Sequence, residues 1–319
     1  MTFLCKLKLK PHKTRNVDMS GNLTKIAFAG LGQMGKHMAR NLLGPDVELT
    51  VCNTSSRGFE DFRAAGAKTT NKAADLAQSA IIFLCLPDDA VVRDVIFGTD
   101  GVLPYLGKGH VVVDCSTVSY ALTRKIDAAL TENRADFLDA PVSGMEARAK
   151  EGTLSIMVGG DTAVLARVEP FLRRMGNKIL HMGAAGSGQL TKLVNQLLYN
   201  INIAGLAEIL PLAVKMGLDP VKVGEIVNSG TGRSHASEFF IPRILERRFN
   251  YGYPMRDAYK DFVNASQLAF AEHVPLPVTQ AAATTYQAAL LKGYGAEDKG
   301  AMIKVFEELL GVEYCEQSM

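Results

Sequence analysis

The chain has 319 residues, of which 47% are hydrophobic and 21% are charged. This length is sufficient for two domains, and the composition is typical of a soluble globular protein rather than a disordered or fibrous one. A formal net charge of +2 is too small to indicate nucleic-acid binding, and we find no apolar run of the roughly 18 to 20 residues that span a bilayer.

The first 23 residues differ from the rest of the chain. They hold five basic residues and one acidic residue, Asp18, and no apolar stretch that resembles a secretory signal. We expect a flexible basic extension here, with an organelle-targeting peptide as the alternative. The five cysteines follow no metal-ligand spacing, so we expect buried thiols, no metal and a cytoplasmic protein.

Residues 24–185 alternate short apolar runs with amphipathic stretches, a pattern typical of βα units in a parallel sheet. We therefore predict an α/β, doubly wound Rossmann domain over these residues. The predicted strands cover residues 26–29, 47–52, 80–86, 110–114, 136–139, 154–158 and 178–182, and the predicted helices cover 34–43, 57–65, 89–97, 119–133 and 162–175.

Strand patterns stop after a glycine-rich segment at residues 183–188. Residues 189–216 then show helical periodicity over an unusually long stretch, in which Pro211 is a candidate kink. The later apolar patterns are helical as well, so we predict an all-helical domain over residues 186–319 that is joined to the first domain by a long helix. Its further helices are predicted at residues 221–227, 237–246, 255–273, 277–292 and 298–310.

A glycine motif follows the first predicted strand and opens the first predicted helix, which is the setting a dinucleotide site requires. Gly30 permits the tight turn, Gly32 lets a pyrophosphate approach the backbone, and Gly35 lets the helix pack on the strand. The pyrophosphate is expected at the helix N-terminus, where free N–H groups attract anions. The predicted cofactor loop comprises Gly30, Leu31, Gly32, Gln33, Met34 and Gly35.

The second predicted strand ends without the acidic residue that an NAD site usually places beside the adenine ribose. Asn53 stands there, followed by the hydroxyl groups of Thr54 and Ser55 and by Arg57. These side chains suit a 2′-phosphate, so the sequence favours NADP over NAD. A solvated Arg57 at the start of a helix is the alternative.

Two further stretches end strands at the carboxyl edge of the predicted sheet, where open α/β sheets bind ligands. Leu86 and Pro87 end one strand, and Thr117 follows another. We expect these residues to line the cofactor site, although Thr117 is equally suited to cap the next helix. Farther along, Ser143 and the Gly144 amide are candidates for holding a carboxylate, while their spacing alone indicates only a turn.

Lys192 lies near the start of the long helix, where helical spacing places Asn195 and Gln196 on the same side of the helix. A lysine inside an apolar helix is costly to bury unless something charged or reactive meets it. In a nicotinamide enzyme the protein must supply a proton to the forming alkoxide, and a lysine with a lowered pKa suits that role. A lysine whose stem packs along the helix while its charge reaches water is the alternative.

Taken in order, these motifs resemble the β-hydroxyacid dehydrogenase family. Besides the glycine loop and Lys192, the resemblance rests on residues 139–144, on the turn at residues 152–154 and on residues 260–261, and it extends from about residue 25 to the C-terminus. It implies a Rossmann domain followed by a 6-phosphogluconate dehydrogenase-like helical domain, a nicotinamide cofactor, a small carboxylate substrate and a homodimer or homotetramer.

The resemblance also implies roles for single residues. Lys192 matches the residue that acts as general acid in reduction and as general base in oxidation. Ser143 and Gly144 match the site of the substrate carboxylate. Asn195 and Gln196 both fall where an amide orients the substrate beside the lysine, and which of them does so is open.

Lys260 matches a residue that approaches the nicotinamide, with a plain surface lysine as the alternative. The chain departs from the family pattern at Met145 and Arg148, where glycine is common, and at His235, near a common aromatic position. These departures flank the expected substrate pocket, so the identity of the substrate stays open. A structural, hydrogen-bonded histidine is the expected role of His235.

The expected activity is the reversible, NAD(P)-dependent interconversion of a small 3-hydroxy carboxylate, similar to 3-hydroxyisobutyrate, with its semialdehyde or keto acid. Two alternatives remain at this point. One is an imine reductase of the same architecture, and the other is a non-catalytic NAD(P)-binding sensor whose cofactor site survives without turnover.

Overall fold

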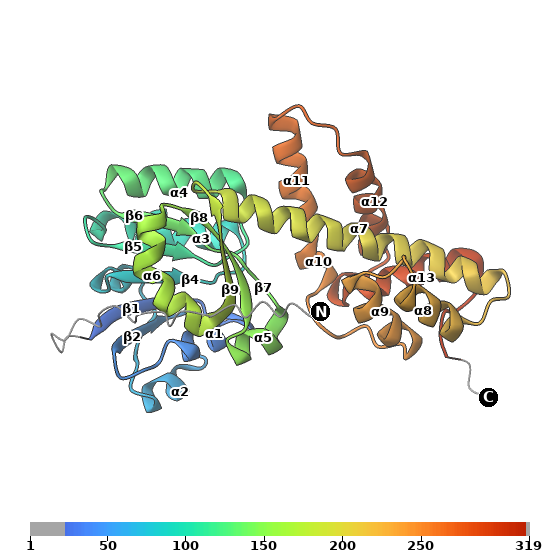
Figure 1. Ribbon diagram of the computed structural model, residues 1–319, viewed down its shortest axis with the longest axis horizontal. Helices are drawn as coiled ribbons and strands as arrows, with labels where there is room; N and C mark the ends of the chain where they lie inside the picture. The colour runs from blue at the N-terminus through green and yellow to red at the C-terminus, as the bar shows by residue number, and fades with distance from the viewer. Residues whose placement is uncertain (1–22, 317–319) are drawn as a thin grey trace, which may run out of the picture.

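The computed structural model describes residues 23–316, which form a sheet lobe and a helical lobe joined by one long helix (Figure 1). The predicted fold class, a Rossmann domain followed by a helical domain, is confirmed. Residues 1–22 and 317–319 lie outside the described part of the chain, and with them lies nearly all of the predicted basic extension.

Six parallel strands form the main part of the sheet, in the order β3-β2-β1-β4-β5-β6. Their central members are buried on both faces, which explains why β4 and β5 consist of nearly unbroken apolar residues. The strands are β1 (Thr24–Ala29), β2 (Val47–Cys52), β3 (Lys68–Thr70), β4 (Ile81–Leu84), β5 (Val111–Asp114) and β6 (Asp136–Asp139).

Helices pack on both faces of this sheet, and each face has its own apolar core. Side chains alternate along a strand, so Ile26 and Phe28 of β1 enter one core while Ala27 and Ala29 enter the other. Helices α1 (Gly35–Asn41), α2 (Phe59–Ala64) and α6 (Thr162–Met175) cover the first core, and α3 (Asp89–Phe97) and α4 (Tyr120–Glu132) cover the second.

Beyond β6 the sheet departs from the parallel arrangement that the sequence pattern indicated. Strand β8 (Leu154–Gly160) runs antiparallel to both β6 and β7 (Val142–Ser143), and β9 (Gly176–Gly183) pairs in parallel with β8. Between β6 and β8 the chain contains only β7 and the short helix α5 (Met145–Glu151), so the polypeptide turns back without the long crossover that a parallel pair needs.

The helical lobe is built along α7 (Ser187–Lys215), which contacts α9, α11, α12 and α13. The single helix predicted at residues 255–273 is divided at Tyr259 into α10 and α11, and the last predicted helix begins with a 3₁₀ turn at Lys299–Met302. The remaining helices are α8 (Pro220–Ser229), α9 (His235–Leu245), α10 (Met255–Ala258), α11 (Lys260–Ala271), α12 (Pro277–Leu291) and α13 (Ile303–Leu310).

Helix α7 corrects the expectation that no segment is apolar enough to span a bilayer. By length and composition alone this helix is long and apolar enough to cross a membrane. Only 33% of its most apolar stretch is buried within the chain. The large apolar side chains that it exposes include Val194, Leu198, Ile209 and Leu212.

A buried carboxylate holds the N-terminus of α7 against the sheet. Asp139, at the end of β6, is fully buried and accepts hydrogen bonds from the backbone N–H of Gly186 (2.7 Å) and Gln189 (2.8 Å). Free N–H groups and the helix dipole favour an anion at this place. Gly188 allows the close approach, because a Cβ there would lie 2.4 Å from the carbonyl oxygen of Met157. These contacts fix where α7 leaves the sheet.

We expect Asp139→Ala to lower the free energy of unfolding by about 3 kcal/mol, because it leaves two buried N–H groups without acceptors. Asp161, an exposed residue that caps α6 by accepting from the N–H of Ala163 and Val164, provides the matched control. Asp161→Ala should cost about 1 kcal/mol. Denaturant unfolding of both variants measures the difference, and equal losses would contradict a special role for Asp139.

Candidate active site

The loop between β1 and α1 makes two close contacts that only glycine allows. Gly30 has φ +100°, and a Cβ there would lie 2.2 Å from the carbonyl oxygen of Cys85. A Cβ on Gly35 would lie 2.0 Å from the carbonyl oxygen of Gly30. At Gly32, by contrast, nothing lies within 4 Å of the Cβ position. The backbone at Gly32 is therefore open to a ligand at the start of a helix, which fits a pyrophosphate.

The end of β2 supports this loop. Asn53 accepts a hydrogen bond from the backbone N–H of Leu31 (3.3 Å) and donates one to the carbonyl oxygen of Ser55 (3.0 Å). Thr54, Ser55 and Arg57 are exposed in the turn that follows. The side chains predicted to face the adenine ribose thus stand together beside the glycine loop.

The ends of β4 and β5 are joined to the first turn of α7 through Ser116. Its hydroxyl accepts from the Leu86 N–H (2.9 Å), and its carbonyl oxygen accepts from the Gln189 amide (2.7 Å). Because α7 carries Lys192 one turn later, these bonds place the carboxyl edge of the sheet beside the helix of the candidate catalytic lysine.

Lys260, the first residue of α11, bridges from the helical lobe to the sheet lobe. Its ammonium group donates to the carbonyl oxygens of Pro87 (2.7 Å) and Thr117 (3.0 Å). Three residues that the sequence assigned to the cofactor site therefore meet directly, although they come from three separate stretches of the chain.

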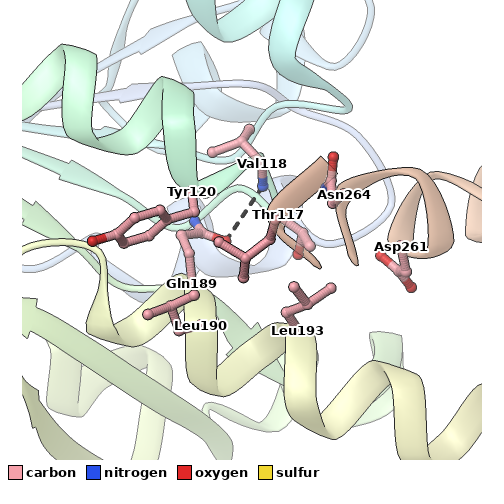
Figure 2. A pocket seen from close by; sticks show the side chains of 9 residues that line it. Thr117, Val118, Tyr120, Gln189, Leu190, Leu193, Asp261 and Asn264 are labelled. Atoms are coloured by element: carbon pink, nitrogen blue, oxygen red, sulfur yellow. Dashed lines mark hydrogen bonds between the residues drawn. The ribbon is translucent and has the colours of Figure 1, made fainter. Parts of the chain in front are cut away.

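A small cavity lies where these elements converge (Figure 2). Its volume of about 20 Å³ is enough for a water molecule but not for a substrate. Figure 2 shows Asp261 and Asn264 of α11 on one side, residues of α7 below, and Thr117 and Val118 on the other side, with a hydrogen bond from the Val118 N–H to Gln189 (3.3 Å). The seam between the lobes is closely packed at this point.

Lys192 is only 8% exposed, on the face of α7 that turns inward. Burial lowers the pKa of its ammonium group to about 8, an effect that the Asp261 carboxylate opposes and the Lys260 charge strengthens. Among residues 23–316, no side chain forms a hydrogen bond or an ion pair with this ammonium. The site therefore holds a lysine that gains and loses a proton near neutral pH.

The two amides beside Lys192 differ in burial and in hydrogen-bond partners. Gln196 is half-buried and donates to the Asp261 carboxylate (3.2 Å), whereas Asn195 is exposed and donates to the Gln196 side chain (3.3 Å). Gln196 is thus the amide on the inner side of α7. Sequence analysis considered Asp261 only as part of the motif at residues 260–261. Its position directly after Lys260 was the signal that could have identified it as a site residue.

Ser143 and Gly144 end β7 and begin α5. Ser143 is half-buried opposite Ser155 of β8, and Gly144 has φ +143°, which favours glycine. No hydrogen bond connects Ser143 with Lys192 in the described part of the chain. The loop of Ser143 and the start of α7 are linked through β8, which pairs with β7 and is in contact with α7.

The three departures from the family pattern have separate structural surroundings. The Met145 side chain lies 3.7 Å from where a Cβ on Gly252 of the helical lobe would stand, so the carboxylate loop faces that lobe. Arg148 donates to the Thr153 carbonyl oxygen and so supports the turn behind Gly144. The ring of His235 packs against that of Tyr199, with centroids 5.7 Å apart.

Glu146 was missed by sequence reasoning. It accepts hydrogen bonds from Gln33 (2.9 Å) and His37 (2.9 Å) and forms an ion pair with Lys36 (2.8 Å). These bonds, that of Lys36 foremost, lower the pKa of the Glu146 carboxyl to about 2. Glu146 thus ties the loop of Ser143 to the glycine loop. No local spacing could reveal a contact between residues so far apart in sequence.

Among residues 23–316, no group of three or more His, Cys, Asp and Glu side chains is arranged to hold a metal ion. The contacts described above involve the glycine loop, the strand-end residues Pro87 and Thr117, and the buried Lys192.

Residues 25–183 match the family described as the NAD binding domain of 6-phosphogluconate dehydrogenase, and residues 186–306 match the one described as NAD-binding of NADP-dependent 3-hydroxyisobutyrate dehydrogenase. A 2-(hydroxymethyl)glutarate dehydrogenase from Eubacterium barkeri is 40% identical, with 90% of this chain and 96% of the relative covered. A 2-hydroxy-3-oxopropionate reductase from Escherichia coli K12 is 36% identical, with 89% and 97% covered.

Among solved structures, a 3-hydroxyisobutyrate dehydrogenase from Mycobacterium tuberculosis with L-serine has a TM-score of 0.80 at 30% identity. The match covers 88% of this chain and 98% of that protein. Similarity therefore extends over both lobes and is not limited to the nucleotide-binding part.

We expect Gly30→Ala to abolish nicotinamide cofactor binding, because its methyl group would collide with the Cys85 carbonyl oxygen and displace the loop. Gly66→Ala is the matched control: Gly66 also has a positive φ, +86°, but nothing lies within 4 Å of its Cβ position. Both variants carry the backbone cost of about 1 kcal/mol, and only the first carries the collision. Titration of NADPH fluorescence measures binding, and unchanged affinity in Gly30→Ala would contradict the assignment of the loop.

Proposed function

Because the chain belongs to the β-hydroxyacid dehydrogenase family, and is a nicotinamide-dependent oxidoreductase of hydroxy acids, we propose that it interconverts a 2-substituted 3-hydroxypropanoate with its semialdehyde. The relatives support this class. 2-(Hydroxymethyl)glutarate, 2-hydroxy-3-oxopropionate and L-serine share a carboxylate and an oxygen-bearing carbon on either side of one substituted carbon. They differ in the substituent on that middle carbon, and the oxygen-bearing carbon is an aldehyde in 2-hydroxy-3-oxopropionate and an alcohol in the other two.

The observation that carries the proposal is the buried Lys192 with its pKa of about 8. The nicotinamide, when bound, supplies or accepts the hydride. Lys192 delivers a proton to the substrate oxygen in reduction and removes it in oxidation. Its positive charge also stabilises the oxyanion that forms on that oxygen.

The substrate carboxylate is held by the Ser143 hydroxyl and the Gly144 amide, both strong donors at the sheet edge. Gln196, with Asn195 as the second candidate, orients the substrate oxygen toward Lys192. Lys260 approaches the nicotinamide from α11, since its contacts with Pro87 and Thr117 already place it over the strand ends.

We propose NADP as the preferred cofactor, with NAD as the alternative. The turn after β2 offers the Thr54 and Ser55 hydroxyls and the Arg57 guanidinium, all exposed, to a 2′-phosphate. Asn53 replaces the carboxylate that would repel such a phosphate. The exposed cation supplies the charge-assisted hydrogen bonds that phosphate recognition uses.

We also propose that the protein acts as a homodimer or homotetramer. Support comes from the exposed apolar side chains of α7, which include Val194, Leu198 and Ile209, because large apolar side chains exposed along one helix are typical of an interaction site. A second copy of the chain is the occupant that the symmetry of homo-oligomers favours. A cytoplasmic location stays a prediction from the cysteine pattern.

The pH dependence of the two directions should differ in sign. Because the Lys192 pKa is lowered to about 8, kcat/KM for oxidation should rise with pH up to about 8 and level off above it, since oxidation needs the neutral amine. Reduction needs the ammonium, so its kcat/KM should be constant below pH 8 and fall above it.

Lys192→Ala should lower kcat by roughly 10² to 10⁴ in both directions and remove this pH dependence. Lys215→Ala is the control on the same helix, because Lys215 is exposed at its far end and donates to the Leu310 carbonyl oxygen. Absorbance of the reduced cofactor follows turnover of 3-hydroxyisobutyrate, L-serine and 2-(hydroxymethyl)glutarate. Full kcat in Lys192→Ala on the best of these substrates would overturn the proposed mechanism.

Arg57→Ala should raise the KM for NADP⁺ about tenfold and leave the KM for NAD⁺ unchanged, because only NADP⁺ carries the 2′-phosphate. The control is Arg63→Ala, since Arg63 lies on the nearby helix α2 and donates instead to Thr69 (2.9 Å). Steady-state kinetics with both cofactors provides the ratio. The same ratio in Arg57→Ala as in the wild type would remove Arg57 from the 2′-phosphate site.

A further inference from the structure

A buried polar cluster lies beyond Lys192 in the helical lobe, and its centre is Asn200 of α7. Asn200 is fully buried, and its side-chain oxygen accepts hydrogen bonds from the Lys299 ammonium (2.5 Å) and the Tyr286 hydroxyl (3.2 Å). Its amide nitrogen donates to the Asp261 carboxylate (3.4 Å). Since Gln196 donates to the same carboxylate oxygen of Asp261, the cluster extends back to the turn of α7 that carries Lys192.

Lys299 is an unusual residue to find inside this lobe. It is 4% exposed, it lies over the Tyr199 ring at 4.5 Å, and in residues 23–316 it forms no ion pair with a carboxylate. Burial lowers the pKa of its ammonium group to about 8, an effect that the Asp261 carboxylate opposes and the Lys192 charge strengthens. The negative charge of Asp261 therefore favours the charged form of two buried lysines, Lys192 and Lys299.

We propose that Lys299 is a positioning residue for Lys192: through Asn200 it fixes the Asp261 carboxylate, and its positive charge favours the neutral form of Lys192. The inference rests on the proposed role of Lys192 as the proton donor and acceptor. Lys299 itself need not touch substrate or cofactor.

The direction of the effect follows from Coulomb's law. The repulsion between two ammonium groups is mutual, so a charged Lys299 acts on Lys192 in the same sense as Lys192 acts on Lys299, next to the larger effects of burial, Asp261 and Lys260 on the Lys192 pKa. In the buried surroundings of both groups this repulsion is weakly screened. The charged and titratable groups that face the cluster are Lys192 and Tyr199 of α7, Arg243 of α9, Lys260 and Asp261 of α11, Tyr286 of α12 and Asp298 beside Lys299.

Stability alone does not account for this arrangement. A buried charge is costly to desolvate, and apolar residues of similar volume often replace buried ionic groups without loss of stability. An effect of the cluster on the protonation of Lys192 would instead give Lys299 and Asn200 a function. For the same reason we expect Lys299→Met to fold with a Tm close to that of the wild type.

The test is the pH profile of kcat/KM for Lys299→Met, recorded in both directions with the full-length protein. Without the Lys299 charge, the pKa that governs oxidation should move upward by about one unit. Oxidation at pH 7 should then fall roughly tenfold, because fewer molecules hold a neutral Lys192, and it should recover at higher pH. Reduction at pH 7, which uses the ammonium, should keep its rate.

Three further variants separate charge from structure. Lys299→Arg keeps the charge, so its profile should stay with that of the wild type. Lys304→Met is the matched control, because Lys304 also lies over an aromatic ring, that of Phe249 at 4.3 Å, but is half-buried and paired with Glu297 (2.5 Å). Lys304→Met should leave the profile unshifted. If Lys299→Met does not fold, Lys299→Gln removes the charge while keeping a donor for Asn200, and the same shift is expected.

An unshifted profile in the neutral variants would overturn the proposal, and so would an equal fall of both directions at every pH. Failure of the proposed function has a different signature. In that case Lys192→Ala itself would keep its turnover, whatever the Lys299 variants show.

Discussion

The position of the candidate site depends on one buried interaction, the capping of α7 by the Asp139 carboxylate. Asp139 closes β6, and the two backbone N–H groups that it binds open α7. Lys192 follows about one turn later on the same helix, so the carboxylate sets both the direction of α7 and the place of the lysine relative to the sheet edge. A buried anion at a helix N-terminus satisfies groups that have no intrahelical partner, which makes this joint specific as well as strong.

The helical lobe completes the site by reaching back to the sheet. Lys260 donates to carbonyl oxygens at the ends of two strands, and Met145 meets the loop around Gly252. Neither lobe holds all the groups of the proposed site: the glycine loop belongs to the sheet lobe, while Lys192 and Lys260 belong to helices. The proposed reaction site therefore lies at the seam between the lobes.

Local constraints could be read from the sequence, and long-range ones could not. Gly30 and Gly35 were predictable because tight turns and close helix packing leave a glycine signature within six residues of chain. Strand β7 and helix α5 were missed because two and seven residues are too short to show a period. The antiparallel direction of β8 was missed for a different reason: an apolar run in the sequence does not show in which direction the strand will run.

The polar face of α7 shows the same limit within one helix. By helical spacing Asn200 and Asn202 are equally good candidates to accompany Lys192, yet Asn202 is exposed and Asn200 is buried. Both lie within a quarter turn or so of Lys192, on opposite sides, so only the packing of α11 and α12 decides between them. Lys299 and Glu146 had no local signal at all, because their partners are far away in sequence.

Two polar contacts, that of Asp139 with the N-terminus of α7 and that of Glu146 with Lys36, differ in how they respond to ionic strength. The Asp139 joint is buried, so mobile ions screen it little. The link from Glu146 to Lys36 is 37% and 47% exposed on its two sides, and an exposed ion pair weakens as salt is added. Rising salt concentration therefore loosens the connection between the carboxylate loop and the glycine loop while the anchor of α7 holds. The spacing between the two candidate ligand loops is thus sensitive to salt, and the position of Lys192 is not.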